Sequence, residues 1–298
     1  MMAMSYSVED GLLAMAEVML QHATSSTQHE ALWEKVGQVR AILRGYGRVI
    51  IAFSGGVDST LLVKLARDVL GKNQVLAATA DSPSLAREDL EATRLLALEL
   101  NVEHWIIPTH EMEDPAYRAN TPNRCYCCKR ELFQELDVIA REQGISVVLY
   151  GAIGDDQGAD RPGQQAAAER GVRAPLQEVG LAKWEVREVA RHFGLSNWDR
   201  PQNACLASRI PHGEEVTEEK LKQIEDAEAV LRAQGFQQVR VRHLGSRARI
   251  EVEAGAVHRF NDPCLQDTVS RALEVIGFDS ISIDPAGYRP GGANNSPP

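Results

Sequence analysis

Residues 54–60, S-G-G-V-D-S-T, have the composition of a phosphate-binding turn. They follow a short apolar, β-branched run at residues 48–53 and precede a helical pattern at residues 61–70. In such a turn, glycines let backbone N–H groups close on an anion, and the unpaired amides of the helix start face it. Asp58 would repel a bare phosphate, so its carboxylate fits a Mg²⁺ ion that bridges to the phosphate.

The five cysteines form a second candidate site. Cys125 and Cys128 form a C-x-x-C pair where a helix opens, and Cys205 lies far downstream. This spacing puts two sulfurs within reach of one metal centre, and a thiolate at a helix start beside basic residues has a depressed pKa. On spacing alone, a structural zinc site or a chance pair is an equal alternative. Because no second C-x-x-C is present, three thiolates suit a 4Fe–4S cluster with one open iron better than a closed zinc site.

No lysine follows the glycines at residues 55 and 56, so the turn is not a GxxxxGK(S/T) loop. In its strand–turn–helix context it resembles the PP-loop of the N-type ATP pyrophosphatases, which cleave ATP between the α- and β-phosphates and adenylate a substrate. The alternative is an ordinary strand–helix turn, which six matching positions disfavour. The resemblance implies ATP binding by Ser54, Gly55, Gly56, Val57, Asp58, Ser59 and Thr60, joined by Ser82 and Gly151.

Length and composition limit the class of protein. A chain of 298 residues can hold a full α/β core and a smaller second domain. No apolar run approaches a membrane span, and residues 1–20 carry acidic but no basic groups, so we expect neither signal nor transit peptide and a cytoplasmic location. In that reducing compartment, five cysteines favour metal or thiol chemistry over disulfides. A net charge of -10 argues against a large nucleic-acid footprint.

Alternating strand and helix patterns predict the fold class as α/β, with a doubly wound parallel sheet. Ligands bind such sheets at the carboxyl ends of the strands, so Ser54, Ser82 and Gly151 should line one crevice. The expected strands lie at residues 48–53, 74–80, 103–108 and 146–151, and the expected helices at 31–44, 61–70, 85–100, 129–143 and 183–193.

The pattern changes after residue 212 to that of a small α+β module. It combines helices expected at 217–233 and 266–276 with strands expected at 238–244, 247–253 and 280–284. We expect four parts: an N-terminal extension at 1–30 with a short helix at 8–20, the PP-loop domain at 31–212, an α+β substrate or oligomerisation domain at 213–285, and a mobile tail at 286–298.

From about residue 35 to residue 290 the chain is similar to the LarE family. The family implies an ATP-dependent sulfur insertase that turns the carboxylates of a pyridinium biscarboxylate mononucleotide into thiocarboxylates, in biosynthesis of the nickel-pincer nucleotide cofactor of lactate racemase. It also implies ATP, Mg²⁺ and a homo-oligomer such as a hexamer. Matching motifs include Asp155-Asp156, Arg161-Pro162-Gly163, Ala174-Pro175-Leu176, residues 204–213 (A-C-L-A-S-R-I-P-H-G), Arg240-Val241-Arg242 and Gly287-Tyr288-Arg289.

The family also implies how sulfur is delivered. In single-cysteine members, the cysteine that matches Cys205 gives up its own sulfur and becomes dehydroalanine. In another branch, three cysteines hold a 4Fe–4S cluster, and Cys125, Cys128 and Cys205 match that branch. The resemblance therefore implies these three as cluster ligands, with sulfide or another donor supplying the sulfur, and sacrifice of Cys205 as the alternative. Cys127 is expected to pack, and Cys264 to be an incidental thiol.

The catalytic residues implied are Cys205, Asp58 and Arg209, with Arg209 steadying the acyl phosphate. Arg240 and Arg242 project from one face of a strand, and paired guanidiniums suit a phosphate. The alternative is an exposed, solvated strand face, and the family resemblance favours binding of the substrate phosphate.

Other positions stay open. Glu251 and Glu253 are either metal ligands or outward-facing charges. Ile153 stands where an asparagine is expected in the nucleotide loop, which puts one polar contact with the nucleotide in doubt.

Three rival functions are weaker. A PP-loop tRNA thiolase would need a basic surface, which the net charge opposes. A nucleotide-binding iron–sulfur or zinc sensor without turnover does not need the complete loop with Asp58 and Ser59. An amidotransferase-type synthetase would carry a glutaminase nucleophile motif, and none is present.

Overall fold

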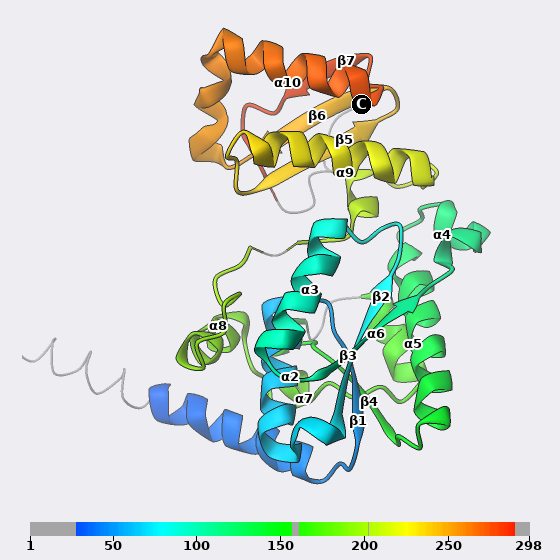
Figure 1. The fold of residues 1–298 in the computed structure, drawn as a ribbon, viewed down its shortest axis with the longest axis vertical. Coiled ribbons are helices and arrows are strands. Elements are labelled where there is room, and N and C mark those ends of the chain that lie inside the picture. Colours follow the sequence, from blue (N-terminus) through cyan, green and yellow to red (C-terminus); the bar gives the residue numbers. More distant parts are fainter. Residues whose placement is uncertain (1–27, 157–160, 202, 290–298) are drawn as a thin grey trace, which may run out of the picture.

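The computed structural model describes residues 28–156, 161–201 and 203–289, which form two stacked units (Figure 1). The larger unit holds a parallel sheet with helices around it, and the smaller C-terminal unit, yellow to red in Figure 1, lies over one end of the larger. The predicted helix at 8–20 lies outside the described residues. Among the described residues, no helix is both long and apolar enough to cross a membrane.

The larger unit is built on four strands in the order β3-β2-β1-β4, all parallel. The strands are β1 (Val49–Ala52), β2 (Val75–Asp81), β3 (Glu103–Pro108) and β4 (Val147–Tyr150). All of β1 is buried, as expected of a central strand covered on both faces. The predicted parallel sheet is confirmed, and each strand lies within one residue of its expected bounds.

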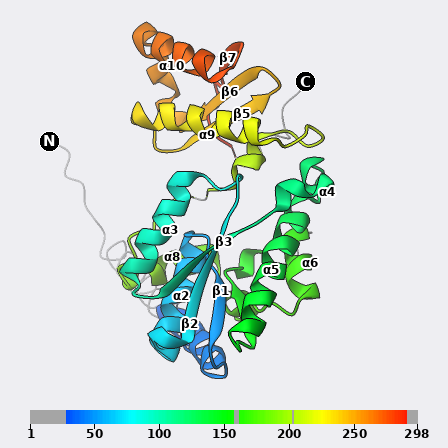
Figure 2. The ribbon, with the colours of Figure 1, turned by 45° about the vertical axis from the view of Figure 1, so that its right-hand side comes forward.

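Helices cover both faces of this sheet, so it is doubly wound as predicted (Figure 2). They are the helix of residues 28–44, α2 (Val57–Leu70), α3 (Arg87–Glu99), α5 (Arg124–Glu142), α6 (Pro162–Glu169) and α8 (Lys183–His192). Alternate residues of β1 point to opposite faces. Val49 and Ile51 pack with α2 and α8, whereas Ile50 and Ala52 pack with α5 and α6.

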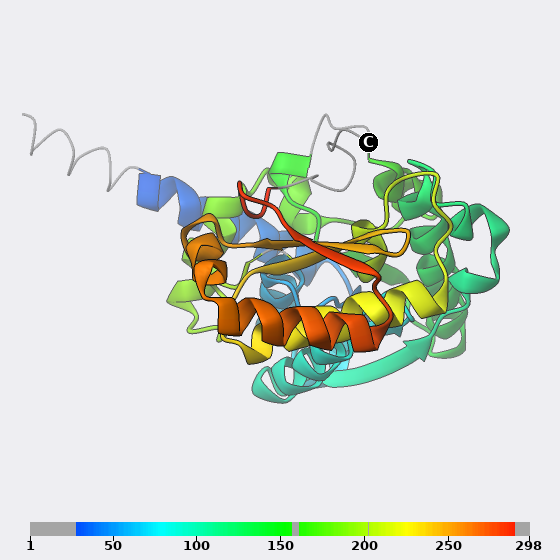
Figure 3. The same cartoon turned by 90° about the horizontal axis from the view of Figure 1, so that it is seen from above.

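The C-terminal unit is a mixed three-stranded sheet in the order β5-β6-β7. Its elements are α9 (Glu218–Ala233), β5 (Val239–Leu244), β6 (Arg247–Val252), α10 (Pro263–Ile276) and β7 (Ser280–Ile283). The helices α9 and α10 lie side by side along one face of the sheet (Figure 3). Thr217 caps α9 by accepting from the Lys220 N–H, as its sequence position predicts. The predicted α+β module is thus present.

Three features of the larger unit differ from expectation. The helix α2 begins at Val57 instead of residue 61, so residues 57–60 of the predicted turn form its first turn. The helix α5 begins at Arg124 instead of residue 129, so Cys125 and Cys128 lie inside its first turns. The apolar spacing that set the expected start begins only after the cysteines. The short helices α4 (Pro115–Arg118), α6 and α7 (Pro175–Glu178) were not predicted, although each has proline at its first position, where a missing N–H costs no hydrogen bond.

A separate apolar cluster joins the two units and fixes the segments that carry the cysteines. It combines Tyr117 and Cys127 with Leu206 of the downstream loop and Ile224 of α9. Cys127 is 7% exposed and packs within this cluster, as expected. The start of α5 and the loop around Cys205 are therefore held together by burial of apolar surface.

Candidate active site

The turn at residues 54–60 is folded tightly against the start of α2. Gly55 has a φ of +69°, and a Cβ there would lie 2.9 Å from the Cγ2 of Thr93, so glycine is required. The Ser59 hydroxyl donates to the Gly56 carbonyl at 3.1 Å and lies 3.1 Å from the Ser54 hydroxyl. These contacts hold the turn against the N-terminus of α2, and a helix N-terminus favours an anion.

Gly151 and Asn197 brace this turn from other segments. A Cβ on Gly151 would lie 2.7 Å from the Ser59 nitrogen, so the end of β4 meets the start of α2 only because residue 151 is glycine. The buried Asn197 donates from Nδ2 to the Gly55 carbonyl and the Thr60 hydroxyl, both at 2.9 Å. Thr60 is fully buried and its hydroxyl donates to the Gly56 carbonyl, so it supports the loop from its buried side. Asn197 was not predicted, because nothing local marks it.

Asp58 lies in the first turn of α2, and both of its carboxylate oxygens are 2.8 Å from the Lys183 Nζ. Burial raises the pKa of Asp58, although Lys183 and Arg187 oppose that shift. A carboxylate oxygen beside a phosphate-binding turn is the ligand that Mg²⁺ prefers. The residues therefore fit the ion, provided that Lys183 gives way. Lys183 is a functional candidate for which the sequence alone predicted no role.

Two residues of the predicted nucleotide site face elsewhere. Ser82 is buried; its hydroxyl donates to Glu111 and accepts from the Ser84 N–H, so it braces the end of β2. Ile153 is 5% exposed and packs in the core with Leu176. Its aliphatic side chain suits that position, which accounts for the absence of asparagine.

Cys125 and Cys205 lie close enough to Cys128 for their charges to change its pKa. Burial raises the pKa of Cys128 to about 12, and Glu111, Cys205 and Cys125 add to the shift. The depressed pKa expected at this helix start is therefore wrong for Cys128, because burial outweighs the nearby cations. Cys125 and Cys205 are exposed, so the cluster of thiols opens to solvent.

Arg124 connects the start of α5, which carries Cys125, to the loop that carries Cys205. Its guanidinium donates to the Asn120 side chain at 2.6 Å and to the Ala207 carbonyl at 2.7 Å, which anchors the Cys205 loop to α5. Burial lowers the pKa of Arg124, but the charges of Cys205 and Cys125 outweigh burial, and the net pKa is raised. No three His, Cys, Asp or Glu side chains among the described residues close around a single ion. Cysteine thiolates are the ligands that iron–sulfur clusters take, so the residue types at these three positions fit such a cluster.

The Cys205 loop is anchored at the carboxyl end of β2, where the Leu206 N–H donates to the Ser84 carbonyl at 2.8 Å. Since β2 neighbours β1, which leads into residues 54–60, the thiols and the nucleotide turn lie at the same edge of the sheet.

Arg209 is fully buried, and its donors are satisfied within the protein. Its Nε and Nη2 donate to Glu228 of α9 at 2.8 and 3.0 Å, and Nη1 donates to the Cys205 carbonyl at 2.9 Å. The remaining contacts go to Ala204, Ser208 and Asn203. Arg209 therefore holds the Cys205 loop in position, and its buried guanidinium is not accessible to an acyl phosphate in this structure.

Arg240 and Arg242 are buried, at 6% and 3% exposure, so the alternative of a solvated strand face is wrong. Arg242 donates to Glu251 at 2.7 Å and to the Ser208 carbonyl at 3.1 Å, while its Nε has no hydrogen-bond partner among the described residues. Arg240 lies 5.1 Å from the ring centroid of Tyr288. Burial, together with the charges of Arg209 and Arg242, lowers the pKa of Arg240 to about 10.

The two glutamates left open by the sequence are structural. Glu251 is 1% exposed and bridges Arg242 and Arg249, which lie opposite each other on β5 and β6. Glu253 accepts from two backbone N–H groups at the start of β5. Three buried guanidiniums, on Arg209, Arg240 and Arg242, thus lie near the buried carboxylates of Glu228 and Glu251. Guanidinium groups gathered in this way suit an anionic ligand.

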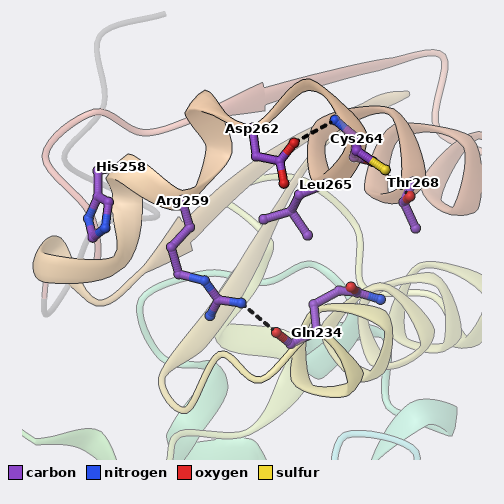
Figure 4. Close-up of a pocket in the computed structure, with 7 residues that line it drawn as sticks. All are labelled: Gln234, His258, Arg259, Asp262, Cys264, Leu265 and Thr268. Carbon is purple, nitrogen blue, oxygen red and sulfur yellow. Dashed lines mark hydrogen bonds between the residues drawn. The ribbon is translucent and has the colours of Figure 1, made fainter.

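Cys264 lies apart from the other thiols, on α10 of the C-terminal unit (Figure 4). It lines a hollow of about 560 Å³ with Arg259 and Gln234, whose carbonyl accepts from Arg259 at 2.7 Å. Asp262 caps α10 by accepting from the Cys264 N–H. Cys264 is exposed, consistent with the expectation of an incidental thiol.

Known proteins resemble most of the chain. The NAD synthase family matches residues 3–150. A pyridinium-3,5-bisthiocarboxylic acid mononucleotide synthase of Lactiplantibacillus plantarum is 36% identical over 256 residues, which cover 86% of this chain and 92% of that protein. An uncharacterized protein of Synechocystis sp. is 43% identical over 263 residues, or 88% of this chain and 98% of that protein. A tRNA-specific 2-thiouridylase of Caulobacter sp. is 29% identical over 65% of this chain and 57% of its own length.

Proposed function

Because this chain belongs to the LarE family of sulfur-inserting PP-loop enzymes, we propose that it converts the carboxylates of a pyridinium biscarboxylate mononucleotide into thiocarboxylates at the expense of ATP. The relative from Lactiplantibacillus plantarum is named for the bisthiocarboxylic acid product. The reaction would serve biosynthesis of the nickel-pincer nucleotide cofactor of lactate racemase.

The first step is adenylation, because a carboxylate is a poor electrophile whose leaving group would be oxide. A substrate carboxylate oxygen attacks the α-phosphorus of ATP, and pyrophosphate leaves with the electron pair of the broken P–O bond. The backbone N–H groups at the start of α2 and the exposed Ser54 hydroxyl would bind the phosphates. Asp58 would hold Mg²⁺, which neutralises charge on the departing pyrophosphate.

The second step is attack of a hydrosulfide on the acyl carbon, which forms the C–S bond and releases AMP. Cys125, Cys128 and Cys205 would hold a 4Fe–4S cluster, which leaves one iron open for an exogenous sulfide. Arg124 and Arg209 hold the Cys205 loop in place for this step. Sulfur is thus supplied without consuming the Cys205 side chain, in contrast to the sacrificial alternative.

The mononucleotide phosphate would bind at Arg240 and Arg242. The closeness of these two buried guanidiniums supports an anion there, as does the Arg242 Nε, which has no hydrogen-bond partner among the described residues. Arg242 donates to Ser208, three residues after Cys205, so this phosphate site adjoins the thiols.

The observation that carries the proposal is the placement of the PP-loop and the Cys205 loop at neighbouring strand ends of one sheet. Its test is to incubate the anaerobically purified chain with Mg²⁺–ATP, sulfide and the mononucleotide. We expect equimolar AMP, pyrophosphate and thiocarboxylate. ATP cleavage that does not depend on the mononucleotide would contradict the assignment.

A tRNA thiolase is the second candidate, because the Caulobacter 2-thiouridylase is also similar. The net charge of -10 opposes it, since tRNA binding needs a basic face. Tight binding of bulk tRNA at moderate salt would favour this second candidate.

We further propose that the protein is a cytoplasmic homo-oligomer. Sedimentation of the purified chain would test the oligomeric state.

A further inference from the structure

One stretch of the chain leads from the nucleotide turn to the proposed sulfur site. At its start, the Asn197 side chain donates two hydrogen bonds of 2.9 Å to the turn at residues 54–60. Cys205 follows eight positions later on the same stretch. We call residues 197–201 and 203–205 the linking stretch, because it connects the turn that would bind ATP with a thiol of the sulfur site.

The end of the linking stretch near Cys205 lies at the surface. Its described residues from 201 to 205 are all exposed, and burial begins again at Leu206. Burial of apolar surface fixes most of a protein core, so an exposed stretch needs polar contacts to keep one conformation. The contacts of the residues just before Cys205 therefore decide where its sulfur lies.

Asp89, in the first turn of α3, supplies two of these contacts. One carboxylate oxygen accepts from the Arg200 Nη2 at 2.6 Å, and the other accepts from the Asn203 Nδ2 at 2.5 Å. The side chains of Arg200 and Asp89 are 30% and 16% exposed, so the ion pair is partly shielded from water and salt. One carboxylate thus holds the linking stretch at two points, the second of them two residues before Cys205.

The helix α3 also supports the nucleotide turn. A Cβ at Gly55 would lie 2.9 Å from the Cγ2 of Thr93, which follows Asp89 by four positions on α3. Because residues four apart lie on one face of a helix, the same face of α3 meets the turn and the linking stretch. On its other side, the Asn203 Oδ1 accepts from the Arg209 Nη2 at 3.2 Å. The helix α3 is therefore a common support for both ends of the linking stretch.

We propose that Asp89 is a positioning residue for sulfur transfer: it holds the linking stretch so that the sulfur site at Cys205 meets the acyl adenylate formed at the nucleotide turn. The inference rests on the proposed function. Water competes with hydrosulfide for the acyl carbon, and its attack breaks the bond to the AMP oxygen, which releases AMP and regenerates the carboxylate. Without Asp89, adenylation continues, but more of the acyl adenylate is lost to water.

The test compares Asp89→Ala with the wild type over a single anaerobic turnover of Mg²⁺–ATP, the mononucleotide and sulfide. We expect pyrophosphate to form at the wild-type rate, because the lost contacts go to Arg200 and Asn203. Conversion of the acyl adenylate to thiocarboxylate should slow by roughly tenfold, as for loss of a charge-assisted hydrogen bond, and AMP should exceed thiocarboxylate. Asn203→Ala, at an exposed position, should give a smaller excess of AMP, so the test does not depend on one variant.

Hydrogen–deuterium exchange tests the positioning without any reactant. In Asp89→Ala, the amides of residues 203–206 should exchange several-fold faster than in the wild type, because this end of the linking stretch is released from α3. Exchange in the first turn of α2 should stay as in the wild type.

Asp137→Ala is the matched control, because Asp137 also accepts from an arginine of another segment, Arg170, at 2.8 Å and 25% exposure. It should change neither the ratio of AMP to thiocarboxylate nor the exchange of residues 203–206. In Asp89→Ala, an unchanged ratio, or equal slowing of pyrophosphate and thiocarboxylate formation, would overturn the role of Asp89 and leave the proposed function standing. A wild-type chain that forms no thiocarboxylate would overturn both.

Discussion

The proposed nucleotide end and the proposed substrate end of this protein are built by different means. At the nucleotide end, consecutive residues lead from the end of β1 into the start of α2, and glycine makes the turn possible. At the substrate end, Arg209 of the Cys205 loop meets Arg240 and Arg242 of β5, and all three are buried near Glu228 and Glu251. A local turn tolerates change elsewhere in the chain, whereas a buried charge network fails when one member is lost.

The largest expected effect is a loss of stability when the buried charge network is broken. Glu228 is fully buried and accepts from Arg209, Arg232 and the Val241 N–H. Glu228→Ala leaves the buried Arg209 without its partner, so we expect the free energy of unfolding to fall by about 3–5 kcal/mol. Urea denaturation measures it, with Glu219→Ala on the exposed side of α9 as the control. A loss as small as that of the control would mean that the network does not support the fold.

The next effect is on chemistry and leaves the fold intact. Asp58→Ala removes the proposed metal ligand from a partly exposed turn, so we expect pyrophosphate release to fall at least about a hundredfold. The thermal midpoint should change little, because the Asp58–Lys183 pair is partly exposed. Pyrophosphate release at the wild-type rate would remove Asp58 from the Mg²⁺ site.

The smallest expected effect is on substrate binding, and it distinguishes the two proposed binding ends from each other. Arg240→Ala should raise the KM for the mononucleotide and leave the KM for ATP unchanged, because Arg240 lies on the C-terminal sheet. Losing one charge-assisted contact costs about 1.5–3 kcal/mol. Arg247→Ala, at an exposed position on β6, is the matched control. Equal weakening of ATP and substrate binding would place Arg240 at the nucleotide instead.

The two ends also differ in how far sequence predicts them. The parallel sheet and the strand–turn–helix order around residues 54–60 follow from local patterns and are found, although α2 already begins at Val57. The burial of Arg240 and Arg242 could not be predicted, because an alternating strand looks the same whether its polar face meets water or buried carboxylates. Nor does any local pattern mark Asn197, whose contacts with Gly55 and Thr60 span more than a hundred residues.

The cysteines lie between these cases. Their spacing predicts a shared centre, and in the structure Cys125 and Cys205 both act on the pKa of Arg124 and of Cys128. The raised pKa of Cys128 could not be predicted, because its burial depends on an apolar cluster with Leu206 and α9 that no local pattern contains.

The placement of three thiols makes a fourth prediction. Cys125→Ala should lose both iron and activity, because it removes a proposed cluster ligand. Cys127→Ala and Cys264→Ala should keep both, since Cys127 packs in the core between the units and Cys264 lies on α10. Iron and acid-labile sulfide content of the anaerobically purified variants measures this. Full iron content in Cys125→Ala would remove that residue from the cluster.

The source of the sulfur is tested most directly by the mass of the chain after turnover. The protein would be incubated anaerobically with Mg²⁺–ATP, the mononucleotide and sulfide, and then analysed by mass spectrometry at Cys205. We predict an unmodified cysteine together with several thiocarboxylate products per chain. Stoichiometric dehydroalanine at Cys205, with no more than one sulfur transferred per chain, would contradict delivery from a cluster.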